Sequence, residues 1–146
     1  MMQQVLDLRW SIIGAAVAGV LLAPLGSSWW RAMQDAYDDA WPVVTLEPSV
    51  LKRDADSMLV HLVGKKHRGC TYLRIQAYTR RPDGTLADAF TKREDMPERG
   101  ATKPVGQIDV GQWRIWPLTG GVAVEIYSQH DCDGRLVTTR VAEVKL

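Results

Sequence analysis

Two different hydrophobic patterns divide this chain of 146 residues. Residues 10–30 (WSIIGAAVAGVLLAPLGSSWW) contain no charged side chain and are bounded by Arg9 and Arg31. A helix of about 20 apolar residues spans the hydrocarbon core of a bilayer. After Pro42 the apolar positions alternate with polar ones, which is the period of β-strands. We therefore expect one N-terminal transmembrane helix followed by an all-β domain.

The ends of the apolar run fit a membrane-spanning helix. Trp10 and Trp29 lie at its opposite ends, so they would meet the two membrane interfaces, where the amphipathic indole is favoured. Pro24 removes one backbone hydrogen bond, which membrane helices tolerate. A cleaved signal peptide would need a more basic start and a small-residue cleavage site. A buried helix of a soluble protein is the third interpretation, and the uncleaved anchor is the one we favour.

Flanking charge gives the orientation. One arginine stands on each side of the run. The N-terminal side adds the amino group against Asp7, and the C-terminal side adds three aspartates before residue 40. Positive charge favours the cytoplasmic side, and acidic residues contribute little. We expect residues 1–9 to be a short cytoplasmic N-terminus and residues 10–30 to cross the inner (cytoplasmic) membrane once. The remaining chain then lies outside the cytoplasm.

Residues 31–41 (RAMQDAYDDAW) keep a helical spacing, with Met33 and Tyr37 adjoining each other at i, i+4. This pattern predicts a short helical stalk that Pro42 ends. In the preceding anchor, small residues such as those at 15 and 19 permit close helix packing. A homo-oligomer formed through residues 10–30 is therefore one expectation for assembly.

Residues 42–146 show the pattern of a β domain. Apolar residues alternate clearly at Met58, Val60 and Leu62, and turn residues stand at 82–84 and 133–134. No stretch of this part repeats apolar residues with a helical period. Many short strands separated by turns are typical of sandwiches. The sequence predicts an immunoglobulin-like β-sandwich of seven to eight short strands.

The two cysteines support two alternative sites. Cys70 precedes one predicted strand and Cys132 follows another, so antiparallel pairing of these strands would place both within the roughly 7 Å Cα separation of a disulfide. An extracytoplasmic location favours oxidation. Alternatively, His67 and His130 stand close to the cysteines in sequence, and two imidazoles with two thiolates form a tetrahedral zinc site. Free thiols are the remaining interpretation, and we favour the disulfide.

Aromatic and arginine side chains are the candidates for partner binding. Trp113 and Trp116 lie three positions apart in one predicted strand, so they occupy opposite faces. One tryptophan is expected in the core, and the other can anchor a partner because tryptophan is frequent in interface hot spots. Alternation gives the strand over residues 71–81 one face with Tyr72, Arg74, Gln76, Tyr78 and Arg80, opposite Leu73, Ile75 and Ala77. The first of these faces is a candidate for partner binding, and a plain solvated face is the alternative.

Composition and missing motifs exclude several function classes. From residue 42 onward there are 16 Lys and Arg against 13 Asp and Glu, a net charge of +3. This charge is too low to indicate a nucleic-acid partner. The chain has no glycine-rich phosphate loop, no serine-nucleophile elbow and no zinc-protease helix motif. We expect no enzyme activity and no cofactor.

The sequence predicts a membrane-anchored, extracytoplasmic binding or assembly module of a bacterial or phage envelope or a virion. It would contact membrane lipid through residues 10–30 and an unknown protein through the β domain. The first alternative is a zinc-binding regulatory domain that uses His67, Cys70, His130 and Cys132. The second is a carbohydrate-binding accessory domain that uses an exposed Trp113 or Trp116.

Overall fold

The computed structural model describes residues 28–95 and 103–146. The chain divides after Ala40 into two compact units. The described part of the first unit is one helix at residues 28–40, and the second unit holds the strands. Each unit is described by itself.

The predicted transmembrane segment at residues 10–30 lies outside the described residues except for its last part. The helix at residues 28–40 includes that end and nearly all of the predicted stalk at residues 31–41. Within the described ranges, no helix combines the length and the apolar character that a membrane crossing requires.

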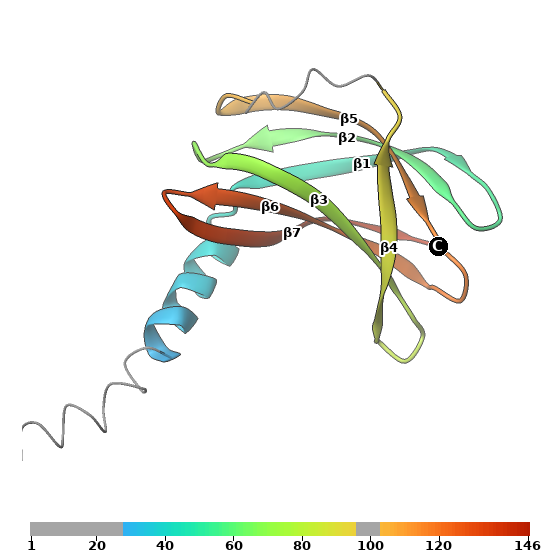
Figure 1. Ribbon diagram of the computed structural model, residues 1–146, viewed down its shortest axis with the longest axis horizontal. Helices are drawn as coiled ribbons and strands as arrows, with labels where there is room; N and C mark the ends of the chain where they lie inside the picture. The colour runs from blue at the N-terminus through green and yellow to red at the C-terminus, as the bar shows by residue number, and fades with distance from the viewer. Residues whose placement is uncertain (1–27, 96–102) are drawn as a thin grey trace, which may run out of the picture. The chain divides into compact units, whose positions relative to one another are not determined.

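The second unit is all-β, as the alternation predicts. Within its described residues it forms one curled sheet of seven antiparallel strands in the order β1-β2-β5-β4-β3-β6-β7 (Figure 1). The predicted number of strands is confirmed. The strands are β1 (Val44–Arg53), β2 (Met58–Lys66), β3 (Thr71–Arg80), β4 (Leu86–Arg93), β5 (Gly106–Trp116), β6 (Ala123–Cys132) and β7 (Arg135–Lys145).

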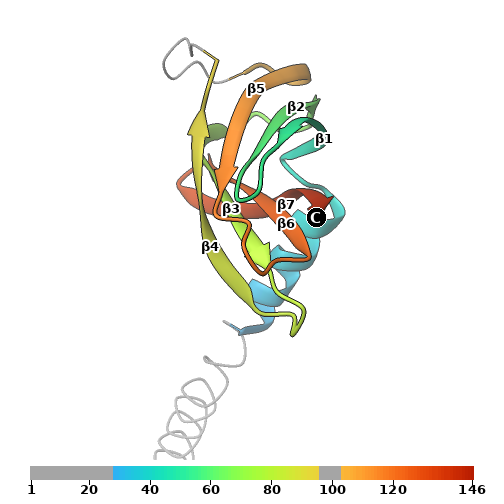
Figure 2. The same cartoon turned by 90° about the vertical axis from the view of Figure 1, so that its right-hand side faces the viewer.

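Strand β4 joins what we expected to be two separate sheets. Its first half, from Leu86 to Ala89, pairs with β3, and its second half, from Phe90 to Arg93, pairs with β5. Figure 1 shows β4 running steeply across the other strands, and Figure 2 shows the sheet bending round as a result. Because β4 pairs with both β3 and β5, the hydrogen-bonded sheet is continuous, whereas the predicted sandwich has two separate sheets.

The core fills the inside of this curl. The predicted alternation in β2 is confirmed, since Met58, Val60 and Leu62 are fully buried. The two edge strands also meet, because the Arg53 guanidinium on β1 donates to the backbone carbonyl of Lys145 on β7 at 2.8 Å. The other strands contribute Val44, Leu46, Ile75, Ala77, Ile115, Val124, Ile126, Val141, Ala142 and Val144 to the same core.

Asp56 fastens the β1–β2 turn to the connection between β5 and β6. Its carboxylate accepts hydrogen bonds from the backbone N–H groups of Leu118 and Thr119, each at 3.0 Å, and from the Thr119 hydroxyl. The hydroxyl and the two N–H groups hold the pKa of the Asp56 carboxyl below its ordinary value. One side chain thus fixes two loops that are distant in sequence.

Candidate binding surface

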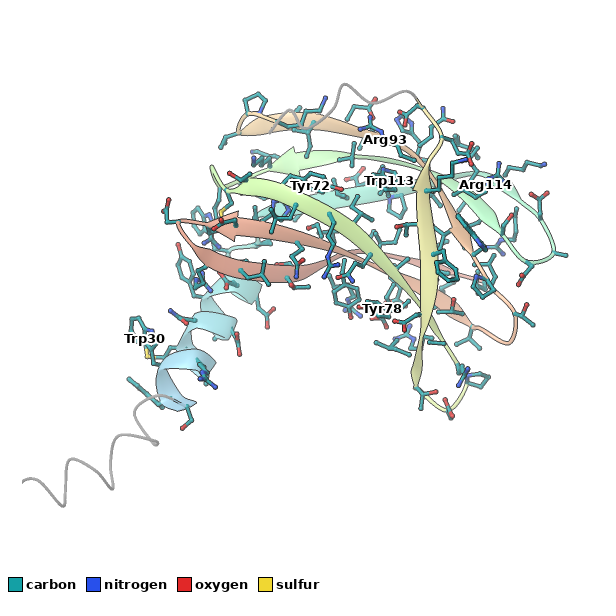
Figure 3. The ribbon with its side chains drawn as sticks, viewed as in Figure 1. Trp30, Tyr72, Tyr78, Arg93, Trp113 and Arg114 are labelled. Carbon is teal, nitrogen blue, oxygen red and sulfur yellow. A yellow bond between two sulfur atoms is a disulfide. The ribbon has the colours of Figure 1, made fainter. Side chains whose placement is uncertain are left out.

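A β-bulge decides which side chains of β3 face outward. Tyr72 pairs with His130, but the next pair joins Arg74 to Gln129, so Leu73 is the extra residue. Because of the bulge, Tyr72 and Leu73 face the opposite way from the predicted alternation. Tyr72 turns inward and packs against the core, and Leu73, expected on the core side, is exposed (Tyr72 in Figure 3). The prediction that Tyr72 shares a face with Arg74 is therefore wrong.

After the bulge, β3 follows the predicted alternation. Ile75, Ala77 and Thr79 are buried, and the residues between them lie on the other face. Strands β6 and β7 extend that outer face beside β3, because Tyr78 pairs with Glu125 and Glu125 pairs with Glu143. We call this surface the polar face. Its members are Arg74, Gln76, Tyr78, Arg80, Glu125, Tyr127, Gln129, Thr138, Arg140 and Glu143.

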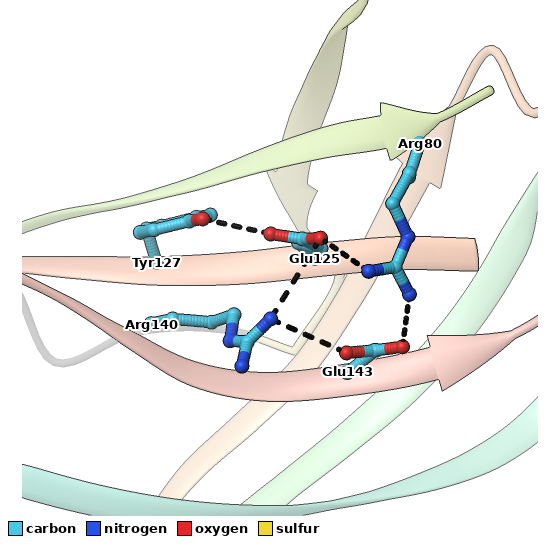
Figure 4. Close-up of polar contacts among 5 residues, drawn as sticks. All are labelled: Arg80, Glu125, Tyr127, Arg140 and Glu143. Carbon is cyan, nitrogen blue, oxygen red and sulfur yellow. Dashed lines mark hydrogen bonds and ion pairs between the residues drawn. The ribbon is translucent and has the colours of Figure 1, made fainter. Parts of the chain in front are cut away.

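A network of ion pairs occupies one end of the polar face (Figure 4). Glu125 lies at its centre with only 6% of its side chain exposed, at 3.2 Å from Arg80 and 3.8 Å from Arg140. The Tyr127 hydroxyl donates to the other oxygen of Glu125 at 2.7 Å. Glu143 contacts both arginines, with 3.4 Å to Arg140. Two arginines and two glutamates thus balance each other in charge.

The network holds its members in fixed positions. A buried carboxylate is costly unless it is paired and hydrogen-bonded, and Glu125 has both kinds of partner. Burial and the bond to Glu125 raise the pKa of the Tyr127 phenol. The Tyr127 ring meets Tyr78 edge to face at 5.4 Å. Arginine and tyrosine side chains are therefore presented on the sheet with little remaining rotamer freedom.

The other end of the polar face is joined by hydrogen bonds that involve no carboxylate. Arg74 donates to the Gln129 side chain at 2.8 Å, and Gln129 donates to the Thr138 hydroxyl at 3.1 Å. These three residues come from β3, β6 and β7 in turn. The face is consequently continuous across all three strands.

The two candidate tryptophans lie on opposite faces, as alternation predicts. Trp113 packs against the core and its indole N–H donates to the Val110 carbonyl at 3.2 Å (Figure 3). Trp116 lies across the strand pair from Phe90, with ring centroids 5.9 Å apart and planes inclined by 33°. Phe90 is 67% exposed. Both tryptophans are half-buried, and the exposed ring of this pair is Phe90, which the sequence interpretation missed.

The predicted disulfide is confirmed. Cys70 and Cys132 are bonded, with a Cα–Cα distance of 4.6 Å. Both sulfurs are therefore unavailable as the thiolate ligands that the zinc alternative requires. The proposed imidazole ligands bond elsewhere, His67 with the Thr45 hydroxyl at 2.9 Å and His130 with a serine hydroxyl. Among the residues that the structure describes, no three His, Cys, Asp or Glu side chains group as metal ligands.

His130 lies buried near the disulfide with 4% exposure. Its Nε2 contacts the Ser128 hydroxyl at 3.1 Å, and its Nδ1 is buried without a hydrogen-bond partner. Burial, assisted by the charges of Lys66 and Arg68, lowers the pKa of His130 to about 4. Lys66 is itself buried, and its ammonium donates to the carbonyls of Cys70 and Lys103 at 2.7 and 2.8 Å. The imidazole is therefore neutral near pH 7.

The polar face includes several residues that the sequence interpretation did not identify. Glu125, Tyr127, Arg140 and Glu143 come from the last two strands, and only the strand register places them beside Arg80. Alternation within β6 was the available signal, since Glu125 and Tyr127 are two positions apart.

Comparisons of the chain with family models, curated proteins and solved structures find no match.

Proposed function

We propose that the protein is a membrane-anchored binding or assembly module whose β domain contacts a protein partner outside the cytoplasm. The arginine–tyrosine network on the polar face is the observation that carries this proposal. Arginine and tyrosine are enriched among residues that dominate binding energy. Side chains already held by Glu125 and Glu143 lose less freedom when a partner binds.

We infer that the domain is a variant of the immunoglobulin-like sandwich. Dividing the sheet between β4 and β3 leaves β1-β2-β5-β4 and β3-β6-β7, which is the four-and-three strand order of constant-type domains. The bridging β4 and a disulfide that joins the residue before β3 to the last residue of β6 are departures from that plan. Many cell-surface domains share the architecture, and for function this is support by analogy only.

Two features support the location of the domain. A disulfide is stable in oxidising compartments and rare in the cytosol, and Cys70 and Cys132 are bonded. The uncharged run at residues 10–30 supports a membrane anchor. Together they favour a single-pass protein of the inner membrane with its β domain outside.

Thiol labelling of the full-length protein tests the location. Spheroplasts that express it are treated with a membrane-impermeant maleimide, before and after reduction. We expect labelling of Cys70 and Cys132 only after reduction, because both thiols are bonded and face the outside. A Gln4→Cys variant in a Cys70→Ser, Cys132→Ser background is the control, and it should label only after lysis. Native cysteines that label only after lysis would place the domain in the cytoplasm.

Site-specific photo-crosslinking tests the polar face. A benzophenone amino acid replaces Thr138, which is exposed on that face, or Lys65, which is exposed on β2. In the native envelope we expect a discrete crosslinked protein from position 138 and none from position 65. Arg140→Ala should weaken that product, since it removes one member of the network. Equal products from both positions would mean that the polar face is merely solvated.

The aromatic pair of Phe90 and Trp116 favours a second candidate, a carbohydrate-binding accessory domain. The exposed Phe90 and the half-buried Trp116 pack together on the outside of the sheet, and aromatic side chains commonly line ligand sites. A glycan array probed with the wild type should then give a signal that Trp116→Ala removes. Trp113→Ala is not a matched test, because Trp113 belongs to the core. Unchanged glycan binding by Trp116→Ala and Phe90→Ala would exclude this function.

A further inference from the structure

The helix at residues 28–40 carries an exposed aromatic stripe. Trp30, Met33 and Tyr37 are exposed by 59%, 46% and 55% (Trp30 in Figure 3). At 100° per residue these three side chains fall within an arc of about 60° on the helix surface. Trp29 is also exposed and borders this arc. A row of exposed large apolar side chains on one side of a helix marks a surface that interacts with a membrane or with a protein.

The exposed charged residues of the helix lie on the other side, and a third aspartate, Asp38, is buried. Arg31, Asp35 and Asp39 are exposed, and the two aspartates are centred about 170° from the middle of the stripe. A 13-residue helix of this kind is about 20 Å long. A helix with one apolar and one charged side can lie in the plane of a membrane interface rather than across it.

We propose that the stripe of Trp30, Met33 and Tyr37 docks into the interfacial layer of a lipid bilayer, so that this helix lies along the membrane surface. The proposal rests on the membrane anchor of the proposed function, because the uncharged run at residues 10–30 leads directly into the stripe. Tryptophan and tyrosine suit this layer, since each has an apolar body and a polar tip. The helix is then a surface-bound element and not the upright stalk that its sequence predicts.

The charge of the helix selects the kind of lipid. Two exposed aspartates stand against one arginine, and no lysine is present in residues 28–40. Amphipathic helices that bind anionic membranes carry lysine and arginine on the polar side. The stripe therefore fits a zwitterionic surface, which it contacts through its aromatic rings and Met33 without help from headgroup charge.

The test uses the full-length protein in phosphatidylcholine vesicles with its native disulfide oxidised. Single cysteines replace Met33, Tyr37, Asp35 or Asp39, and each carries the same environment-sensitive fluorophore. Spin-labelled lipids with the label near the headgroup serve as quenchers. We expect quenching at positions 33 and 37 to be about threefold stronger than at 35 and 39, because only the stripe contacts lipid. Adding phosphatidylglycerol should not strengthen this pattern.

Three patterns overturn the proposal. Weak quenching at all four positions means an upright helix in water. A fluorophore shielded from water at 33 and 37 but not quenched means that protein covers the stripe. Equal, strong quenching at all four positions means an embedded helix. Flotation of the vesicles distinguishes a failure of the helix docking from a failure of the membrane anchor. If the protein floats with the vesicles and shows any of these patterns, only the helix docking is refuted. If the protein does not float, both the docking and the anchor are refuted.

Discussion

His130 shows how strongly burial changes the chemistry of a single residue. Its pKa is about 4 in the folded protein, against about 6.5 in an unfolded chain. Between these values the unfolded chain binds more protons, so the free energy of unfolding falls as pH is lowered from 6.5 to 4. A shift of this size corresponds to about 3 kcal/mol. Thermal unfolding of the full-length protein in detergent at several pH values measures it.

Replacing His130 isolates this effect. His130→Phe keeps a ring beside Tyr72 and removes the titrating nitrogens, so its stability should vary much less between pH 4.5 and 6.5. Ser128→Ala is the matched control, because it removes the partner of His130 but keeps the imidazole. A His130→Phe protein with the wild-type slope would show that another group takes up the protons.

The sequence suggested His130 as a metal ligand. The spacing of the cysteines and histidines does not reveal that the imidazole is buried or that the cysteines are oxidised.

At the scale of elements, Gly64 fixes how closely β1 and β2 approach. A Cβ atom built on Gly64 would lie 2.0 Å from the Thr45 carbonyl oxygen and 2.9 Å from the Leu46 Cα. Both are backbone atoms, which cannot move aside as a flexible side chain can. Gly64→Ala should therefore force the strands apart and destabilise the domain by about 3 kcal/mol, as measured by thermal unfolding.

Gly69 supplies the control for this prediction. A Cβ at Gly69 meets no atom within 4 Å, so Gly69→Ala should change stability little. If the two variants were equally stable, β1 would not pack closely against β2 at this position. Alternation predicts the strands themselves, but it does not reveal this contact or the bulge at Leu73. Both depend on which strand lies alongside, and pairing between distant strands leaves no periodic signal in either one.

At the scale of the whole molecule, the sequence predicted what local pattern determines. The number of strands followed from alternation and turns, and the disulfide followed from the ends at which Cys70 and Cys132 stand. The continuity of the sheet was not predictable in this way. It depends on β4 changing partners between Ala89 and Phe90, and nothing in the composition of this strand marks that position. The polar face was not predictable either, because only the pairing register of β3, β6 and β7 brings its residues together.

The disulfide gives the last prediction, because it closes a long loop of the domain. Cys70 and Cys132 are 62 positions apart, and closing such a loop stabilises the folded state by about 4 kcal/mol in the chain-entropy model. For a domain of this size the loss should lower the melting temperature by about 20 °C. The double variant Cys70→Ser, Cys132→Ser and the reduced wild type should melt together, well below the oxidised protein. Adding reductant should not change the double variant, which controls for effects of the reagent. If reduction left the melting temperature of the wild type unchanged, the bond would not constrain the unfolded chain, and its presence would no longer support a domain adapted to an oxidising compartment.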